Sequence, residues 1–365
     1  MVAHTLPEDI DDSLAGNWSG NPRFDWAAEK GFLISCTEHV SPALFDTTPI
    51  NLVAIDCQRD FTSPKGSLFV GGRSSTGAVD DMRRLSRWVF QNAPVITRIF
   101  RTRDRHRFGQ IFCSEFWLDR DGVPLKINHE IIWNEGGRVL VSVIPGTNEV
   151  EAYDVRPNPM LLPWVAPDKT YQWLYAFCVH YCKSVEAKGY RLYLWVKHCV
   201  DGTIGNTLDA MFDESCAYHS ALRSVPPVEA PKGDFPLSEF YGVFAPEVMV
   251  AHDGSTVAQP KQWLHDELNF GKEIYGGEAM SHCAGWSILQ RVAYRKEHGM
   301  PVSDMYLLRD CTSSVVIRGA SDQILVDFTP QGEKLIDELM LEGVNIVEST
   351  TPIEEWPGME HLRAA

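Results

Sequence analysis

The stretch GKEIYGGEAMSHCAGWSILQRVAY (residues 271–294) contains the local pattern on which the fold depends. Residues 271–280 predict a buried strand, and the segment from Cys283 onward predicts a helix. A strand followed closely by a helix is the repeating unit of an α/β fold. Cys283 is therefore expected at the start of a helix, just beyond the carboxyl end of a strand.

The same alternation of strands and helices runs through most of the chain. The expected strands are short and continuously apolar, which is typical of a parallel sheet covered on both faces. Ligands of such sheets bind beyond the carboxyl ends of the strands, so functional side chains are expected there. Besides 271–280, the sequence predicts strands at 50–58, 94–102, 190–199, 304–310 and 344–349, and helices at 78–93, 170–189, 205–222 and 330–343.

One region departs from this alternation. Residues 113–168 alternate apolar and polar side chains and contain Asp-Gly and Gly-Gly turn signals, a pattern typical of antiparallel hairpins. We therefore expect an inserted β-rich lobe at about 113–190. The chain then divides into an N-terminal extension (1–50) packed on the body, a main domain (51–350) that carries the insertion, and a C-terminal tail (351–365).

The composition is that of an ordinary globular protein. Of 365 residues, 44% are hydrophobic and 22% are charged, which allows a sizeable core. The formal net charge of -16 argues against binding to nucleic acid or to an anionic membrane surface. No apolar run is long enough to span a bilayer and the N-terminus has no apolar signal core, so a cytoplasmic protein is expected. Nine cysteines at irregular spacing fit reduced thiols better than a disulfide framework.

Two segments could supply metal ligands. In TRDRH (102–106), Asp104 and His106 lie two residues apart at the end of an expected strand, so both side chains can reach one site while Arg105 points away. His198 closes the next expected strand, in WVKHC (195–199). Two imidazoles and a carboxylate are a common ligand set for Zn²⁺, Mn²⁺ or Fe²⁺. Because Asp-x-His pairs are also common on protein surfaces, an ordinary surface pair is the alternative.

Cys283 is the candidate nucleophile. A helix N-terminus lowers the pKa of a cysteine, and the small residues before it can turn tightly and offer N–H groups to a developing oxyanion. Asp56 ends the strand at 50–58, where a carboxylate could serve as general base. Lys232 would take part if it turned inward toward both groups. The alternatives are a buried structural cysteine and a solvated lysine.

The order of these motifs along the chain is more specific than any single motif. In this order the sequence resembles the cysteine hydrolases of the isochorismatase-like superfamily, nearest to nicotinamidases and nicotinamidase-related amidases. The matching segments extend from residue 54 to residue 314. They are AIDCQRDF (54–61), GSLFVGG (66–72), TRDRH (102–106), WVKHCVDGTIG (195–205), PKGDFPLSEFYGVF (231–244), GGEAMSHCAGW (276–286) and LLRDCTSS (307–314).

The resemblance implies a six-stranded parallel sheet with helices on both faces, and amide hydrolysis through a cysteine thioester. It implies a divalent metal ion, with Zn²⁺ as the first candidate and Mn²⁺ or Fe²⁺ as alternatives. It also implies a homo-oligomer and a cis peptide before Ala279. The implied site residues are Asp56, Lys232 and Cys283 as a catalytic triad, the N–H groups of Ala279 and Cys283 as an oxyanion hole, Phe61 and Trp195 beside the substrate ring, and Asp104, His106 and His198 as metal ligands.

Three departures from the family leave the substrate open. The chain is longer than typical nicotinamidases, Arg105 stands where many members have Trp, and no histidine occupies 109–112, where some members have a further ligand. The expected substrate is a small cyclic or aromatic amide, with nicotinamide, giving nicotinate and ammonia, as the first candidate. The alternatives are a larger amide admitted by the insertion and a catalytically idle relative that binds a ligand in the same pocket.

Overall fold

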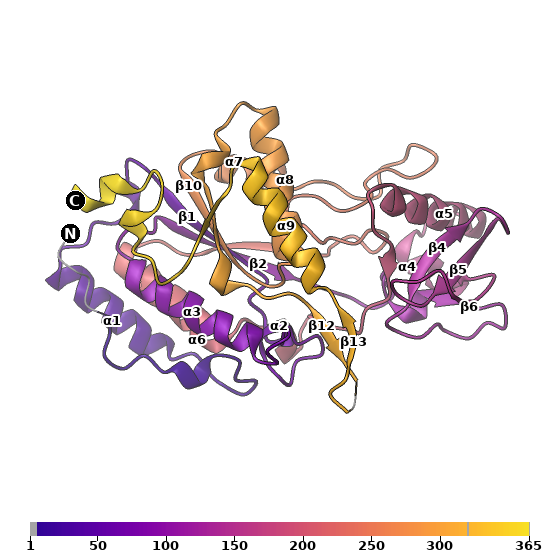
Figure 1. Cartoon of the computed structure of the whole chain (residues 1–365), viewed down its shortest axis with the longest axis horizontal. Coiled ribbons are helices and arrows are strands. Elements are labelled where there is room, and N and C mark those ends of the chain that lie inside the picture. The colour runs from indigo at the N-terminus through magenta and orange to yellow at the C-terminus, as the bar shows by residue number, and fades with distance from the viewer. Residues whose placement is uncertain (1–5, 320, 365) are drawn as a thin grey trace.

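The computed structural model describes residues 6–319 and 321–364, and a six-stranded parallel sheet forms its centre (Figure 1). The strand order is β14-β11-β10-β1-β2-β9, and each neighbouring pair is parallel. Helices lie on both faces of this sheet, which confirms the predicted α/β fold. The strands are β1 (Ile50–Ile55), β2 (Arg98–Asp104), β9 (Val228–Lys232), β10 (Lys272–Gly277), β11 (Met305–Leu308) and β14 (Asn345–Val347).

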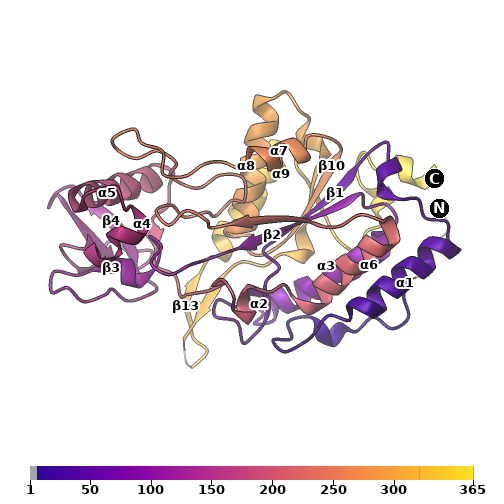
Figure 2. The same cartoon turned by 180° about the vertical axis from the view of Figure 1, so that it is seen from behind.

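The two helical layers explain why the central strands are apolar at successive positions (Figure 1 and Figure 2). Along β1, Leu52 and Ala54 belong to the core on one face, whereas Val53 and Ile55 belong to the core on the other. All four side chains are buried, as the alternation of side chains along a strand requires. One layer contains α3 (Gly77–Asn92) and α6 (Ala210–Arg223), and the other contains α7 (Gln262–Glu267), α8 (Cys283–Glu297) and α9 (Thr329–Glu342).

A lobe of antiparallel strands lies between β2 and β9 in the chain and projects away from the sheet (Figure 1). Its larger sheet has the order β6-β5-β4-β8, and β3 pairs with β7 in a second sheet. Ile131, Leu140 and Phe177 form part of its apolar core. The lobe contains β3 (Trp117–Leu118), β4 (Glu130–Asn134), β5 (Val139–Val143), β6 (Val150–Ala152), β7 (Arg156–Pro157), α4 (Leu162–Val165), α5 (Tyr171–Ala187) and β8 (Leu192–Tyr193).

The predicted strand at 190–199 is wrong as a member of the main sheet. In that range the structure has the short strand β8, which pairs antiparallel with β4 in the lobe. The strand next to β2 is instead β9, which sequence reasoning missed because it contains Pro231 and follows two further prolines. Proline lacks an N–H group and is tolerated in edge strands, and β9 is the edge of the sheet.

The terminal segments pack on the layer that contains α3 and α6. Helix α1 (Phe24–Thr37) buries Ala27 in a cluster with Phe90, Tyr218 and Leu222. Near the other end of the chain, the Trp356 ring stacks on the Trp88 ring with centroids 5.8 Å apart. The division at residues 50 and 350 remains a prediction, and residues 1–5 and 365 of the proposed extension and tail lie outside the described residues.

Two short elements follow strands of the main sheet in the chain. Helix α2 (Arg59–Thr62) follows β1, and a hairpin joins β12 (Val316–Arg318) to β13 (Ile324–Asp327). Among the helices of the described residues, none has the length and apolar character needed to cross a membrane.

Candidate active site

The register of the sheet brings four functional side chains together. β10, β1, β2 and β9 are neighbours in that order. Cys283 and Asp56 follow β10 and β1 in the chain, whereas Asp104 and Lys232 are the last residues of β2 and β9. In the pairing of β2 with β9, Asp104 lies opposite Lys232. Residues opposite each other in neighbouring strands point to the same face, so their side chains can meet.

The Lys232 ammonium group is the centre of this cluster. Its Nζ lies 3.0 Å from Asp56 Oδ2, 3.0 Å from Asp104 Oδ1 and 3.4 Å from Cys283 Sγ. The lysine side chain is 1% exposed, so these contacts take the place of water. Burial favours the neutral amine, but Asp104 and Asp56 outweigh burial and raise the pKa of Lys232 well above its ordinary value. The lysine therefore remains charged between the two carboxylates and the sulfur.

Asp56 is fixed at the residue that follows β1. Its Oδ1 accepts a hydrogen bond from the Thr102 hydroxyl (2.6 Å), and its backbone N–H donates to the same hydroxyl oxygen (2.9 Å). Its φ of 45° lies in the left-handed region, which is unfavourable for a residue with a side chain. Burial raises the pKa of Asp56 although the Lys232 charge opposes this. A carboxyl group with a raised pKa is suited to taking up and returning a proton.

Cys283 is the first residue of α8 and is buried. Burial raises the pKa of its thiol well above the ordinary value, and the Lys232 charge acts in the opposite direction. The lowering expected from the helix N-terminus is therefore outweighed by loss of water. The thiol is protonated in the resting site and needs a base to become a nucleophile.

The turn between β10 and α8 presents two uncommitted backbone donors. Its Glu278–Ala279 peptide is cis, as the resemblance implies. In the described part of the chain, the N–H groups of Ala279 and Cys283 have no acceptor, whereas the Met280 N–H donates to Ser313 O. Ala279 and Cys283 both line the cavity beside the thiol. Free N–H groups next to a nucleophile are what an oxyanion hole requires.

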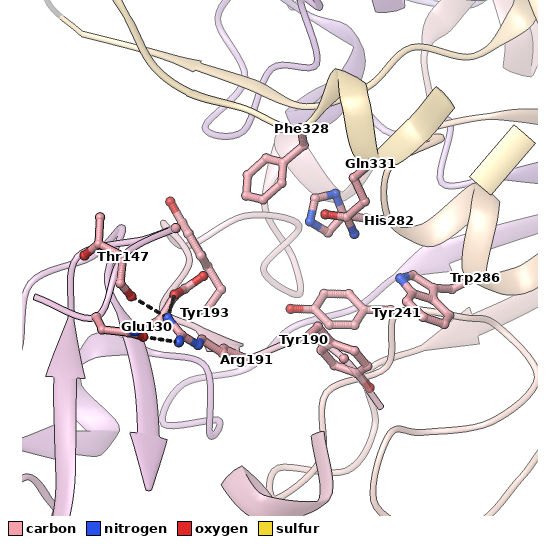
Figure 3. A pocket seen from close by; sticks show the side chains of 13 residues that line it. Glu130, Thr147, Tyr190, Arg191, Tyr193, Tyr241, His282, Trp286, Phe328 and Gln331 are labelled. Carbon is pink, nitrogen blue, oxygen red and sulfur yellow. Dashed lines mark hydrogen bonds and ion pairs between the residues drawn. The ribbon is translucent and has the colours of Figure 1, made fainter. Parts of the chain in front are cut away.

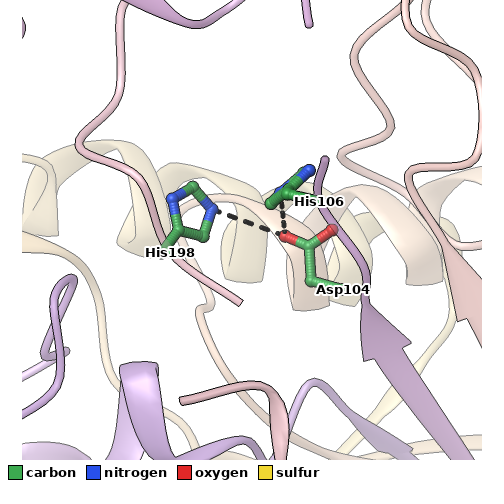
Figure 4. Close-up of side chains that lie close together, drawn as sticks. All are labelled: Asp104, His106 and His198. Carbon is green, nitrogen blue, oxygen red and sulfur yellow. Dashed lines mark ion pairs between the residues drawn. The ribbon is translucent and has the colours of Figure 1, made fainter. Parts of the chain in front are cut away.

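Asp104, His106 and His198 form a second cluster that shares Asp104 with the first (Figure 4). Asp104 Oδ2 lies 2.9 Å from His106 Nε2 and 3.6 Å from His198 Nε2. The other ring nitrogens have protein partners, because His106 Nδ1 lies 3.1 Å from Gln110 Oε1 and His198 Nδ1 lies 2.7 Å from Val196 O. All three predicted metal ligands are buried and lie together.

The hydrogen bonds around these histidines determine where their protons lie. The partner of His198 Nδ1 is a backbone carbonyl, which can only accept, so His198 donates from Nδ1. Gln110 Oε1 also accepts the Arg107 N–H (2.9 Å), so the same atom accepts from His106 Nδ1. Both Nε2 lone pairs then face the Asp104 carboxylate, an arrangement that is repulsive unless a cation lies among them. The ligand atoms lie within 4.8 Å of one another, so the cluster fits a divalent metal ion.

The predicted ring-binding residues line the cavity beside Cys283. Phe61 comes from α2, and Trp195 comes from the segment that follows β8. The Phe61 ring centroid lies 5.3 Å from that of His198, and the Trp195 centroid lies 5.1 Å from that of His282. Aromatic walls of this kind suit a planar substrate ring.

Sequence reasoning missed Glu239 and Gln110. Glu239 lines the same cavity, and its buried Oε2 has no hydrogen-bond partner among the described residues. Burial raises the pKa of this carboxyl well above its ordinary value. The residue lies within the motif at 231–244, but the motif does not indicate which of its side chains point inward. Gln110 lies in 109–112, the stretch that contains no histidine, and its Oε1 contacts His106 Nδ1.

Other singled-out residues lie outside the reacting cluster. Arg105 is half-exposed and pairs with Asp201 at 2.6 Å, so it does not enter the cavity. Glu278, the residue before the cis peptide, is buried beside Asp81. All nine cysteines are free, and all except Cys36 are buried.

Comparison with solved structures finds nicotinamidases and pyrazinamidases, which belong to the isochorismatase-like superfamily that the motifs resemble. The yeast nicotinamidase bound to the inhibitor nicotinaldehyde is 17% identical, with a TM-score of 0.47 over 82% of this chain and 99% of the yeast chain. A nicotinamidase/pyrazinamidase of Acinetobacter baumanii is 16% identical, with a TM-score of 0.47 over 84% of this chain and 98% of its own.

A third match is the pyrazinamidase of Pyrococcus horikoshii in complex with zinc. It is 16% identical, with a TM-score of 0.40 over 82% of this chain and 98% of its own. No family model matches the sequence, and no curated protein matches it.

Proposed function

We propose that this chain is a cysteine amidase that hydrolyses a small cyclic or aromatic amide, with nicotinamide as the first candidate substrate. The observation that carries the proposal is the single buried cluster in which Lys232 Nζ contacts Asp56, Asp104 and the Cys283 sulfur. The three predicted catalytic groups are far apart in the sequence, yet they lie within reach of one bound molecule. A structural cysteine has no need of a buried acid and a buried amine as neighbours.

In the proposed reaction, Asp56 takes the proton of the Cys283 thiol, and the thiolate attacks the amide carbon. The electron pair of the carbonyl moves to oxygen, where the N–H groups of Ala279 and Cys283 stabilise the negative charge. Asp56 then gives its proton to the amide nitrogen, the C–N bond breaks, and ammonia leaves with a thioester on Cys283. Water then attacks the thioester carbon and gives a proton to Asp56. The C–S bond breaks, Asp56 returns the proton to the Cys283 sulfur, and the carboxylic acid is released.

Lys232 has an electrostatic role in this scheme. Its charge lies between Asp56 and the sulfur, so it stabilises whichever of the two is negative. Because the proton moves between two neighbours of the same cation, the site needs little rearrangement during proton transfer. Thr102 contributes by holding Asp56 in one orientation through the bond to Oδ1.

Asp104, His106 and His198 would hold the metal ion, and Zn²⁺ is the first ion to test. When bound, such an ion supplies Lewis acidity for a ring nitrogen or a water molecule. The protein groups around it act independently of that chemistry. Gln110 and the Val196 carbonyl fix the two histidine rings. Asp104 also forms an ion pair with Lys232 through its other carboxylate oxygen.

The test measures ammonia release from nicotinamide, pyrazinamide, benzamide and an aliphatic amide, combined with mass spectrometry of the acid-quenched enzyme. We expect ammonia from an aromatic amide and a covalent acyl group on the peptide that contains Cys283. Cys182, a buried thiol of the lobe, provides the internal control and remains unmodified. Absence of ammonia from the whole panel, with ligand binding retained, would instead support the idle relative.

Two further expectations come with this proposal. We propose a homo-oligomeric enzyme of the cytoplasm, for which light scattering and cell fractionation are the direct measurements. For the metal site, elemental analysis of His198→Ala should show reduced metal content compared with the unmodified protein. Full occupancy in that variant would reject the assignment of His198 as a ligand.

A further inference from the structure

A second cavity, of about 480 Å³, lies between the lobe and the body of the protein (Figure 3). The lobe contributes Thr147, Arg191 and Tyr193, and the body contributes Tyr241, His282 and Phe328. Tyr241 and His282 also line the smaller cavity beside Cys283. The two cavities therefore meet at these two side chains, and the larger one, called the outer cavity below, exists because the lobe is inserted.

His282 presents a hydrogen-bond donor at this junction. Its Nδ1 lies 2.9 Å from the Ser281 hydroxyl, which already accepts the Val315 N–H (3.0 Å). Ser281 is fully buried, and the described residues offer its hydroxyl proton no acceptor besides His282 Nδ1. The hydroxyl must therefore donate to Nδ1, which places the ring proton on Nε2. Burial lowers the pKa of His282 to about 3, so the ring stays neutral near pH 7.

Tyr241 presents a second donor beside the first. Its hydroxyl oxygen accepts the Trp195 indole N–H (3.3 Å), and the hydroxyl proton has no acceptor among the residues that the structure describes. The ring centroids of Tyr241 and His282 lie 5.7 Å apart. Like the Tyr241 hydroxyl, His282 Nε2 has no acceptor among the described residues, so both donors are free to bind an acceptor of a bound molecule.

The remaining walls define what kind of molecule fits. Phe328, whose ring centroid lies 4.8 Å from that of His282, provides an aromatic surface, as does Trp286. Arg191 is the cation of the outer cavity, and it is already paired with Glu130 at 3.1 Å. Since that charge is compensated, the cavity favours a neutral planar group over an anion.

We propose that the outer cavity binds a substituent on the ring of an aromatic primary amide, and that this substituent carries a neutral hydrogen-bond acceptor. The scissile carboxamide lies against Cys283, and the acceptor receives hydrogen bonds from His282 Nε2 and the Tyr241 hydroxyl. This inference extends the proposed function by specifying its substrate. It makes His282 a specificity-determining residue.

The test compares two amides of nearly the same shape, meta-acetylbenzamide and meta-isopropenylbenzamide, together with their para isomers. The acetyl group has an acceptor oxygen where the isopropenyl group has a carbon. In one isomer pair we expect kcat/KM for the acetyl compound to exceed that of its partner roughly three- to ten-fold, the value of one neutral hydrogen bond. In His282→Phe, which keeps an aromatic ring, this ratio should fall to about one. His282→Gln, which restores an N–H donor, should recover part of it.

A pair of blocking variants identifies the cavity. Asn148→Trp narrows the outer cavity from the lobe, whereas Ile127→Trp narrows a different cavity lined by Leu68 and Val315. We expect Asn148→Trp to lower the ratio of kcat/KM between meta-acetylbenzamide and benzamide, and Ile127→Trp to leave it unchanged. The opposite pattern, or an acceptor preference that survives in His282→Phe, overturns the inference.

Binding measurements separate this inference from the proposed function. Dissociation constants of the same amides are measured with Cys283→Ala by tryptophan fluorescence, because Trp195 and Trp286 line the two cavities. If no amide is hydrolysed but the acetyl compound still binds more tightly than its partner, the outer site stands and the amidase proposal fails. If benzamide is hydrolysed and neither isomer pair shows an acceptor preference, the amidase proposal stands and the outer site fails.

Discussion

Strand β10 and helix α8 carry parts of two buried ionic clusters that differ in how completely they are satisfied. In the first, Glu273 accepts hydrogen bonds from Arg291 (2.8 Å), Arg295 (3.0 Å) and the Tyr275 hydroxyl (2.6 Å). The guanidinium of Arg291 also donates to the Leu268 carbonyl (2.7 Å). Each carboxylate oxygen has a partner, and the cluster joins α8 to the sheet. We call it the brace.

The second cluster, which contains Lys232 and the first residue of α8, borders a cavity and is less completely satisfied. The carboxylate oxygens that face Lys232 have that ammonium group as partner, but His106 Nε2 has no hydrogen-bond partner in the described part of the chain. Such atoms cost free energy when buried, whereas the brace avoids that cost. The comparison teaches that burial of charge alone does not mark a reaction site. Unsatisfied atoms beside a cavity do, because a ligand can complete them.

The sharpest test of this comparison replaces Cys283. We expect Cys283→Ala to lower kcat for ammonia release by at least about ten-thousand-fold, since no other thiol and no serine or threonine hydroxyl lines the cavity among the described residues. Its unfolding free energy should stay within about 1 kcal/mol of the original, because one small group is removed. Cys182→Ala is the matched control. It should lose stability in the lobe core while keeping kcat, and near-normal kcat in Cys283→Ala would exclude the covalent mechanism.

Breaking the brace should have the opposite result. Arg291→Met leaves Glu273 with one guanidinium partner, and we expect the unfolding free energy to fall by about 3 kcal/mol. The kcat of the folded fraction should be unchanged, because Arg291 does not line the cavity. Urea unfolding and steady-state kinetics provide the two measurements. Arg309→Met, which breaks the exposed pair with Glu333, should cost less than about 1 kcal/mol; an equal cost in both variants would contradict the comparison.

The buried neutral side chain of His219 should make the free energy of unfolding depend on pH. His219 donates from Nε2 to the Ile96 carbonyl (2.9 Å), and no described residue provides a hydrogen-bond partner for its buried Nδ1. Burial lowers the pKa of His219 to about 4, against about 6.5 in an unfolded chain. The unfolded state therefore binds more protons between these values, and stability falls as pH drops from 6.5 toward 4, by up to about 3 kcal/mol. The urea midpoint should vary less with pH in His219→Leu than in the original protein. An equal pH dependence in both proteins would exclude His219 as the cause.

The smallest expected effect concerns the support of the metal site. Gln110→Ala removes the acceptor that holds His106 Nδ1, and we expect metal affinity to fall roughly 10- to 100-fold. Competition with a fluorescent chelator measures this affinity. Gln262→Ala, which changes an exposed side chain of α7, is the control and should bind metal normally. If both variants bind alike, Gln110 does not orient the ligand.

The sequence predicted the central elements because local patterns are strong there. The apolar run of β1 and the strand, turn and helix around Cys283 follow from periodicity and small residues. β9 was missed because its proline is tolerated only through its place at the sheet edge. His198 was predicted at a strand end but lies in a loop after the lobe.

The contacts that give the site its chemistry were less accessible to sequence reasoning. The family order of motifs led to Asp56, Lys232 and Cys283, but it gave no indication of Glu239, Gln110 or His282. Their positions depend on contacts between segments that are distant in the chain, such as the Val315 N–H that fixes the Ser281 hydroxyl. The raised pKa of the Cys283 thiol was also unpredictable, since it reflects how completely the fold excludes water.

The attachment of the lobe has a mechanical consequence. The chain leaves the sheet at His106 and returns from the lobe just before His198, and backbone bridges join His106 to Val200 and Cys113 to Trp195. The two candidate ligands thus lie on the two chain segments that connect the lobe to the body. A divalent ion held by both side chains would cross-link the two segments that connect the lobe to the body.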